Sequence, residues 1–143
     1  MNQTLKAFGY PDTLIKEYDH WVLVIRPKQI TLGACTIIAK SDVTSLAALP
    51  SAAGAELITV MADFEQTLRA AFGAVKFNYL ALMMVDPNPH FHAIPRYDRI
   101  VEFMGGQYLD ELWPKPPDLT RLLDIDDTKL QAIQNVLIQT LEG

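Results

Sequence analysis

The chain has 143 residues, of which half are apolar and a fifth are charged, and its formal net charge is −5 at pH 7. This length and composition predict one globular domain with a buried core and exclude an intrinsically disordered chain. The negative charge argues against a general nucleic-acid-binding protein, which would carry a basic face, but a local cluster of hydrogen-bond donors can still bind a small phosphorylated ligand.

The hydropathy of the chain and its cysteine content predict a cytoplasmic protein. No apolar run approaches the ~20 residues of a membrane span, and residues 1–12 lack the basic and apolar regions of a signal peptide. Cys35 is the only cysteine, which excludes a disulfide within the chain and fits a reducing compartment. We expect Cys35 to be a small buried residue on a strand.

A β-hairpin is predicted near the start of the chain. Residues 20–27 (HWVLVIRP) and residues 33–40 (GACTIIAK) are both rich in β-forming side chains. The turn between them contains Gly33, as turns in hairpins often do. Lys28 and Gln29 lie in the same turn, and we expect both side chains to face solvent.

Two helices are predicted after the hairpin. Residues 41–50 indicate a short helix with Asp42 as its N-cap. Residues 51–73 indicate a long helix, with Ser51 as its N-cap and Gly73 as the left-handed residue that ends it. Apolar side chains recur along the long helix at three- and four-residue steps, so we expect one apolar stripe that packs against a sheet.

Further strands and a last helix are predicted in the second half of the chain. Residues 75–85 form a long β-rich run with few polar side chains, which is typical of a central strand. Residues 88–97 contain prolines, which cannot donate ladder hydrogen bonds, so we expect this stretch to enter the sheet late or at an edge. Residues 99–106 indicate another strand, residues 113–118 a proline-stiffened linker, and residues 127–143 a C-terminal helix.

The order of these elements indicates the fold class. A hairpin is followed by helices, then by strands, and then by a final helix, so strands and helices are partly segregated along the chain. Alternation of single strands with single helices would instead indicate a parallel sheet. The sequence therefore predicts an α+β fold with a mainly antiparallel sheet.

The segment NPHFHAIPRY, which begins at Asn88, holds two of the three histidines of the chain. If this segment is extended, Asn88, His90 and His92 point to one side of the sheet and Phe91 points to the other. The three side chains on the first side then follow one another at steps of ~7 Å. An imidazole suits a nucleophile at neutral pH, because its ordinary pKa of ~6.5 leaves one ring nitrogen unprotonated.

Three interpretations of the histidine pair are open at this point. In the first, one histidine attacks phosphorus and the other supports it. In the second, both bind a metal ion; zinc would need further ligands, and the remaining candidates, His20, Asp86 and Cys35, have no telling spacing. In the third, the pair is structural and its ring nitrogens bond to the backbone. The spacing alone does not decide between them.

The segment resembles the signature of the histidine-triad (HIT) superfamily, which is His-φ-His-φ-His-φ-φ with φ apolar, often followed by Pro-Arg. Residues 88–94 match this pattern, except that Asn88 stands in place of the first histidine, and the Pro-Arg tail ends at Arg96. Residues 21–40 are similar to the hairpin of the family, and residues 77–85 resemble the strand before its motif.

The resemblance implies an α+β fold around a five-stranded antiparallel sheet, with one long helix, a short helix and a C-terminal helix. It implies a single domain over residues 1–143, with a core at about 15–105 and a C-terminal linker and helix at 106–143. Relatives usually form homodimers, so we expect a second copy of the chain as a partner, and we expect neither nucleic acid nor a membrane.

The resemblance also implies hydrolysis or nucleotidyl transfer at the α-phosphate of a nucleoside phosphoramidate, a dinucleoside polyphosphate or a nucleotide sugar. His90 matches the nucleophile that becomes nucleotidylated, and His92 matches the histidine that supports the phosphate. Asn88 is expected to keep part of the orienting role of the missing histidine. The protein needs no metal of its own for this reaction; Mg²⁺ would arrive, if at all, with a polyphosphate substrate.

Three further positions are expected to bind the nucleotide. Arg26 matches a hairpin position that often contacts ribose in relatives, and its guanidinium could hold a phosphate in bidentate geometry. Met84 lies where relatives carry neutral donors, and Arg96 either holds a phosphate or pairs with an acidic residue. Because Asn88 and the pair Met83-Met84 depart from the family, the alternative is a weak or inactive enzyme that binds nucleotides in a regulatory role.

Overall fold

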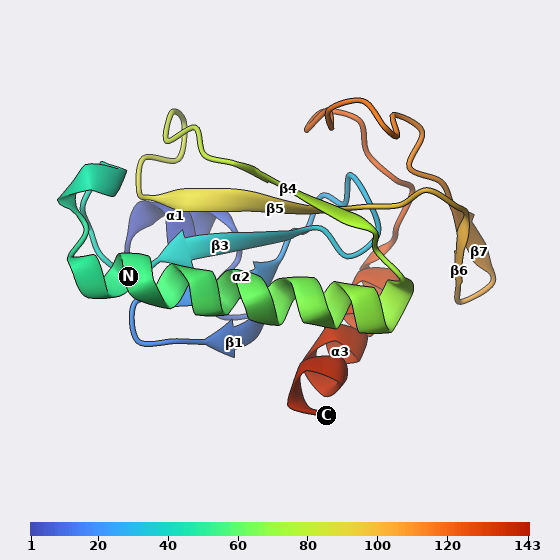
Figure 1. Cartoon of the computed structure of the whole chain (residues 1–143), viewed down its shortest axis with the longest axis horizontal. Coiled ribbons are helices and arrows are strands. Elements are labelled where there is room, and N and C mark those ends of the chain that lie inside the picture. Colours follow the sequence, from blue (N-terminus) through green and yellow to red (C-terminus); the bar gives the residue numbers. More distant parts are fainter.

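A five-stranded sheet forms the centre of the computed structural model, which describes residues 1–143 (Figure 1). The strand order is β1-β2-β3-β5-β4, and every neighbouring pair is antiparallel. The α+β class and the sheet that we expected are therefore confirmed. The strands are β1 Leu14–Glu17, β2 Trp21–Ile25, β3 Cys35–Ala39, β4 Lys76–Leu80 and β5 His90–Arg96.

One face of the sheet is covered by the long helix α2, Ser51–Phe72, as Figure 1 shows. The ring of Phe64 on α2 lies edge-on against Phe77 of β4, with the ring centroids 5.6 Å apart. The C-terminal helix α3, Asp127–Glu142, packs beside α2 and β1 and is capped by the side chain of Asp126. No helix of the chain combines the length and the hydropathy needed to cross a membrane.

The opposite face of the sheet carries two smaller apolar clusters. At one end, Leu5 of helix α1, Gln3–Ala7, packs with Val22, Val24 and Ile38. At the other end, Ile30, Ala34 and Ile94 pack together, and the partly buried Leu80 and Leu119 adjoin them. In Figure 1, α1 lies behind the sheet, on the side away from α2. This second face is the one that the histidines of β5 line.

The two helices predicted at 51–73 and 127–143 are confirmed in extent, whereas the short helix predicted at 41–50 is not. The long helix ends at Gly73, which takes the expected left-handed conformation with φ +76°, but it begins directly after Pro50 and has no side-chain cap. The short helix expected from Asp42 is wrong: only one 3₁₀ turn, Leu46–Ala48, forms there. Asp42 is exposed, and its carbonyl accepts a hydrogen bond from the side chain of Asn88. Its backbone is therefore bonded to the residues that precede β5 and not to a helix.

Two strands lie at other positions in the sheet than the sequence predicts. Residues 75–85 were expected as a central strand, but β4 is short and lies at the edge of the sheet. β5 lies inside, between β3 and β4. The prolines do not prevent this, because the β3–β5 register ends at the pair Cys35–Ala93, and Pro95 therefore faces only β4. Residues 99–106 contribute to a separate two-stranded sheet of β6, Val101–Phe103, and β7, Gly106–Tyr108.

The turn between β2 and β3 is held by a buried side chain. Gln29 was expected in solvent, but its Nε2 donates to the carbonyls of Arg26 and Ala34, and its Oε1 accepts from the backbone N–H of Gly33. Gly33 has φ +85°, and a Cβ at this position would lie 2.4 Å from Cδ1 of Leu68 on α2. Only glycine fits this close approach of the turn to the helix.

We expect Gly33→Ala to lower the free energy of unfolding by roughly 1–3 kcal/mol, because the added methyl group meets Leu68 and the backbone has a positive φ. Urea denaturation measures this change. Gly54→Ala is the matched control: its added Cβ meets nothing within 4 Å inside α2, so the free energy of unfolding should rise by up to about 1 kcal/mol. Equal midpoints for Gly33→Ala and the wild type would contradict the prediction.

Candidate active site

β5 places both histidines on the face of the sheet that α2 does not cover. His90 lies opposite Ile38 and His92 lies opposite Thr36 on β3. The two imidazole rings meet edge to face, with centroids 5.1 Å apart. Phe91, between them in sequence, points to the other face and packs against the ring of Trp21. The alternation expected along this segment is therefore confirmed.

His90 is oriented by the backbone. Its Nδ1 lies 2.7 Å from the carbonyl oxygen of Asn88. Because a carbonyl oxygen can only accept, Nδ1 must carry the hydrogen, and in the neutral ring Nε2 is then unprotonated. His90 thus presents the lone pair of Nε2 as the atom available for nucleophilic attack.

The side chain of Asn88 makes other contacts. Its Oδ1 accepts hydrogen bonds from the backbone N–H and the hydroxyl of Thr4, at 3.2 and 3.0 Å. Its Nδ2 donates to the carbonyls of Asp42 and Val43, at 3.2 and 3.1 Å. The orienting contact to His90 therefore comes from the Asn88 carbonyl, and the expected contribution of its amide to the histidine pair is not seen. The amide instead fastens helix α1 and the loop after β3 to the start of β5.

His92 is buried without a partner for one ring nitrogen. His92 is only 6 % exposed, and its Nδ1 has no hydrogen-bond partner within the protein. Burial, followed by electrostatic interactions with His90 and with the guanidinium of Arg26, lowers the pKa of His92 to about 4. His92 is therefore neutral at pH 7 and can support a phosphate as a hydrogen-bonding group rather than as a cation.

Arg26 and Thr36 adjoin this pair. Arg26 directly follows β2, its Nη1 donates to the carbonyl of Lys28, and its Nε is buried without a partner. Burial lowers the pKa of its guanidinium. The hydroxyl of Thr36 is also buried without a partner, directly across the strands from His92. The sequence analysis missed Thr36, although a single hydroxyl at an inward position of the apolar strand CTIIA was a usable signal.

The known proteins that match this chain do so in their solved structures. No protein-family model and no curated protein matches the sequence. A histidine triad protein from Bradyrhizobium japonicum has 19% identity and a TM-score of 0.72, over 99% of this chain and 96% of that chain. A HIT protein from Sinorhizobium meliloti has 16% identity and a TM-score of 0.74, over 98% and 95%. A hypothetical histidine triad nucleotide-binding protein from Sulfolobus tokodaii has 18% identity and a TM-score of 0.68, over 91% and 83%.

The chain has the histidine-triad fold. This confirms the fold that the resemblance of residues 88–97 implied. At this level of identity the likeness establishes the fold alone. Within the histidine-triad fold, β5 holds the motif and the β2–β3 hairpin lies beside it, as expected.

Met84 lies in the loop between β4 and β5 of the histidine-triad fold. Its side chain is 80 % exposed, and the neighbouring Val85 is also exposed. Met83 takes a positive φ of 46°, which turns the chain at this point. Met84 and Val85 therefore add no buried contact to the histidine pair, and Met84 would contact a nucleotide only from the solvent side.

Arg96 uses four of its five N–H donors within the protein. Its Nε and Nη2 donate to the carboxylate of Asp110, at 2.7 and 3.2 Å, its Nη1 donates to Oδ1 of Asn78, and its Nη2 also reaches the carbonyl of Lys115. Both side chains of the ion pair are almost fully buried, at 3 % and 4 % exposure. Of the two roles predicted for Arg96, the structure shows the pairing with an acidic residue, Asp110. Arg96 is therefore not part of the proposed nucleotide site.

The N-terminal segment lies directly over the histidines of the histidine-triad motif. We call residues 2–8 the N-terminal cover. The ring of Phe8 lies 5.7 Å from the ring of His90 and 5.8 Å from that of His92, centroid to centroid. Asn2 adds two hydrogen bonds to the carbonyls of Ala39 and Ser41. Together with the Thr4–Asn88 contacts, these keep His90 only 2 % exposed.

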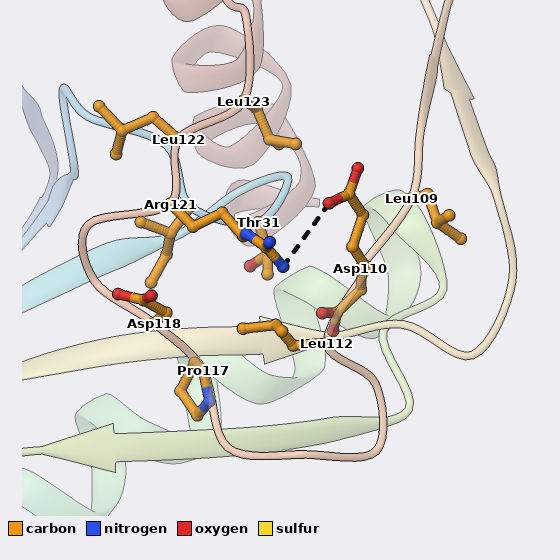
Figure 2. Close-up of a pocket in the computed structure, with 11 residues that line it drawn as sticks. Thr31, Leu109, Asp110, Leu112, Pro117, Asp118, Arg121, Leu122 and Leu123 are labelled. Atoms are coloured by element: carbon orange, nitrogen blue, oxygen red, sulfur yellow. Dashed lines mark ion pairs between the residues drawn. The ribbon is translucent and has the colours of Figure 1, made fainter.

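Neither a metal cluster nor the cavity in Figure 2 involves the histidine pair. No group of three or more His, Cys, Asp or Glu side chains converges in a way that could hold a metal ion, so the metal interpretation lacks its third ligand.

The cavity in Figure 2 has a volume of about 70 Å³ and lies between the β2–β3 turn and the segment 109–123. Arg121 and Glu111 form an ion pair there at 3.7 Å. It is too small for a nucleotide.

The depressed pKa of His92 gives a testable dependence of stability on pH. The unfolded chain binds a proton at His92 near pH 6.5, whereas the folded chain does so only near pH 4. The unfolded state therefore holds more protons between these values, and we expect the free energy of unfolding to fall as the pH drops through this window, by about 2–3 kcal/mol in total.

Urea denaturation at several pH values measures this loss, and His92→Asn is the matched control because asparagine does not titrate. The difference between the two proteins isolates His92, since all other titrating groups are shared. NMR titration of the ring should place the pKa of His92 near 4. A value near 6.5 in the folded protein would contradict the burial argument.

Proposed function

We propose that the chain is a nucleotide hydrolase or nucleotidyl transferase that acts at the α-phosphate of a nucleoside phosphoramidate, a dinucleoside polyphosphate or a similar nucleotide. The observation that carries this proposal is the contact of His90 Nδ1 with the Asn88 carbonyl, which leaves Nε2 free for attack. The Sulfolobus tokodaii protein with this fold is described as nucleotide-binding, which supports the class of ligand.

The proposed reaction proceeds in two steps. Nε2 of His90 attacks the α-phosphorus, an N–P bond forms, and the bond from phosphorus to the leaving group breaks. Water or another acceptor then attacks phosphorus, the N–P bond breaks, and His90 regains its free ring nitrogen. The neutral ring of His92, which meets the ring of His90, and the guanidinium of Arg26, which lies near His92, can stabilise charge on the phosphate oxygens.

The loss of the first motif histidine is compatible with this reaction. A backbone carbonyl aims His90, and every residue type supplies such a carbonyl. Asn88 can therefore replace histidine without removing the orientation of the nucleophile. Its side chain takes up a different task, because it bonds to Thr4 of the N-terminal cover.

We also propose, from the resemblance, that the chain is a single domain that works as a homodimer in the cytoplasm. The edge strand β4 supports this association, since an edge strand presents unpaired backbone groups to a second chain. The nucleotide would be the small-molecule partner, with Mg²⁺ present only as its counterion.

Turnover is tested with a panel of nucleoside phosphoramidates and dinucleoside polyphosphates. We expect His90→Ala to lower kcat/KM by roughly three orders of magnitude or more, since it removes the attacking atom. Intact-mass spectrometry after rapid acid-free quenching should detect a nucleotidylated wild type and no such adduct on His90→Ala. His20→Ala, directly before β2, is the control and should keep full activity. A wild type without turnover and without the adduct would end the enzyme proposal.

The N-terminal cover favours a second candidate, a nucleotide-binding or regulatory protein without turnover. Phe8 packs on both imidazole rings, and His90 has almost no accessible surface. A nucleotide needs more room at His90 than this packing leaves, so its binding requires the cover to move. If the cover stays closed, the chain keeps the fold and the histidines but performs no chemistry.

Chemical modification measures this access without any substrate. Diethyl pyrocarbonate acylates unprotonated imidazole nitrogens, and peptide mass spectrometry reports each histidine. We expect His90 to react more slowly than the half-buried His20 in the wild type, and several times faster in Phe8→Ala, which removes the ring that covers it.

Phe103→Ala is the matched control, because Phe103 is equally half-buried but packs on Phe72, away from the motif. It should leave the rate at His90 unchanged. Equal rates at His90 in the wild type and in Phe8→Ala would show that the cover does not limit access. Turnover in Phe8→Ala but not in the wild type would favour the enzyme with a closed cover over the pure binding protein.

A further inference from the structure

A second hollow lies on the same face of the sheet, beyond the end of β5. It has a volume of about 340 Å³. Its floor is formed by the ends of β4 and β5, and its far wall is formed by the proline-rich segment that follows β7. The residues that line it are Lys76, Asn78, Arg96, Trp113, Pro114, Lys115, Pro116 and Pro117.

The charge of this hollow is opposite to that of the chain. The chain has 17 acidic residues against 12 lysines and arginines, yet the hollow is lined by three cationic side chains and no carboxylate. The charge of Arg96 is balanced by Asp110 behind it. Lys76 and Lys115 have no carboxylate within 4.0 Å, so their charges are not neutralised. The hollow therefore has a net positive charge.

The polar side chains around the hollow are donors. Oδ1 of Asn78 already accepts from Arg96, so the free group of this amide is its Nδ2 donor. Nε1 of Trp113 makes no hydrogen bond within the protein, unlike that of Trp21, which donates to the Ala53 carbonyl. The residues that line the hollow thus carry two ammonium groups, one amide N–H₂ and one indole N–H without a partner in the protein. Such a set matches a ligand that only accepts hydrogen bonds.

The wall of the hollow is held in place by the buried ion pair. Arg96 bonds to Asp110 and to the carbonyl of Lys115, and the backbone N–H of Trp113 bonds to the Asp110 carbonyl. The three prolines in the wall restrict the backbone further. The backbone at Trp113 and Lys115 is therefore positioned beside β5 before any ligand arrives, which lowers the entropy lost on binding.

We propose that this hollow binds a phosphate-bearing anion, held by Lys76, Lys115 and the amide of Asn78, with the ring of Trp113 as its flat wall. Lysines act as point charges for phosphate oxygens, and the volume accommodates more than one phosphate group. A single carboxylate would neutralise only one of the two free lysines.

The hollow is distinct from the histidine pair. In the β4–β5 register, Leu80 lies opposite His92, whereas Lys76 lies opposite Arg96, four residues further along each strand. This corresponds to roughly 13 Å. Ile94, Leu80 and Leu119 pack in the interval. The anion can therefore be either the far end of a long polyphosphate substrate or a separate phosphate compound, and the proposal stands on the shared chemistry of both.

Isothermal titration calorimetry with sodium tripolyphosphate tests the binding. We expect saturable binding to the wild type that weakens with added salt, and about tenfold or greater weakening in the double variant Lys76→Ala/Lys115→Ala, which removes both free cations. The matched control is Lys6→Ala/Lys28→Ala: it changes the net charge equally, at exposed lysines outside the hollow. The affinity of this control should stay within twofold of the wild type.

Tryptophan fluorescence locates the ligand, because Trp21 is fully buried in the core and Trp113 lines the hollow. Tripolyphosphate should change the emission of the wild type and leave that of Trp113→Phe unchanged. Lys76 and Lys115 are exposed, so the double variant should fold normally, which circular dichroism checks. Absence of saturable binding, or equal weakening in both double variants, would overturn the proposal.

Two further measurements distinguish the sources of the anion. If the hollow holds the far end of a long substrate, Lys76→Ala/Lys115→Ala should raise KM for a dinucleoside polyphosphate but not for a nucleoside phosphoramidate. If it holds a separate compound, both KM values should stay unchanged while tripolyphosphate binding is lost. The calorimetry does not require turnover. Absence of the proposed enzyme activity and absence of anion binding at the hollow are therefore separate results.

Discussion

The contacts of Asn88 connect the two properties that decide whether the histidines can react. Its backbone carbonyl accepts from His90 Nδ1 and so determines which ring nitrogen is free. Its side chain and backbone N–H bond to Thr4 and so hold the N-terminal cover against the two imidazole rings. One residue thus orients the nucleophile and also helps to close the access to it. A histidine at this position would have a different shape and could not make the same four side-chain contacts.

The face of the sheet opposite α2 has two ends of different character. At the histidine end, the polar groups are buried, His92 is neutral at pH 7, and three side-chain atoms have no partner within the protein. At the other end, the buried pair of Arg96 and Asp110 supports an open, cationic hollow. A buried ion pair of this kind is weak evidence for net stability, but loss of one partner typically costs 3–5 kcal/mol because a charge is left unpaired. Its clearest effect here is to position the proline-rich wall.

The parts of the structure that the sequence predicted depend on local patterns. The β2–β3 hairpin, helix α2 and the common face of His90 and His92 follow from alternation and from three- and four-residue steps over short stretches. The parts that it missed depend on distant pairs. Thr4 and Asn88 are 84 positions apart, and no local pattern indicates that they meet. The acidic partner of Arg96 was expected only as a type, because its identity depends on how the chain returns after β6 and β7. Strand β1 is short and mixed in polarity, so it carries no clear period of its own.

The N-terminal cover also determines what an affinity measurement on this protein would report. A ligand that binds only the open form shows an apparent Kd equal to the intrinsic Kd divided by the open fraction. If the cover is open in about one molecule in a hundred, the apparent affinity falls about a hundredfold although no contact with the ligand has changed. The packing of Phe8 and the hydrogen bonds of Thr4 would then set the ligand concentration at which the protein responds, independently of the residues that touch the ligand.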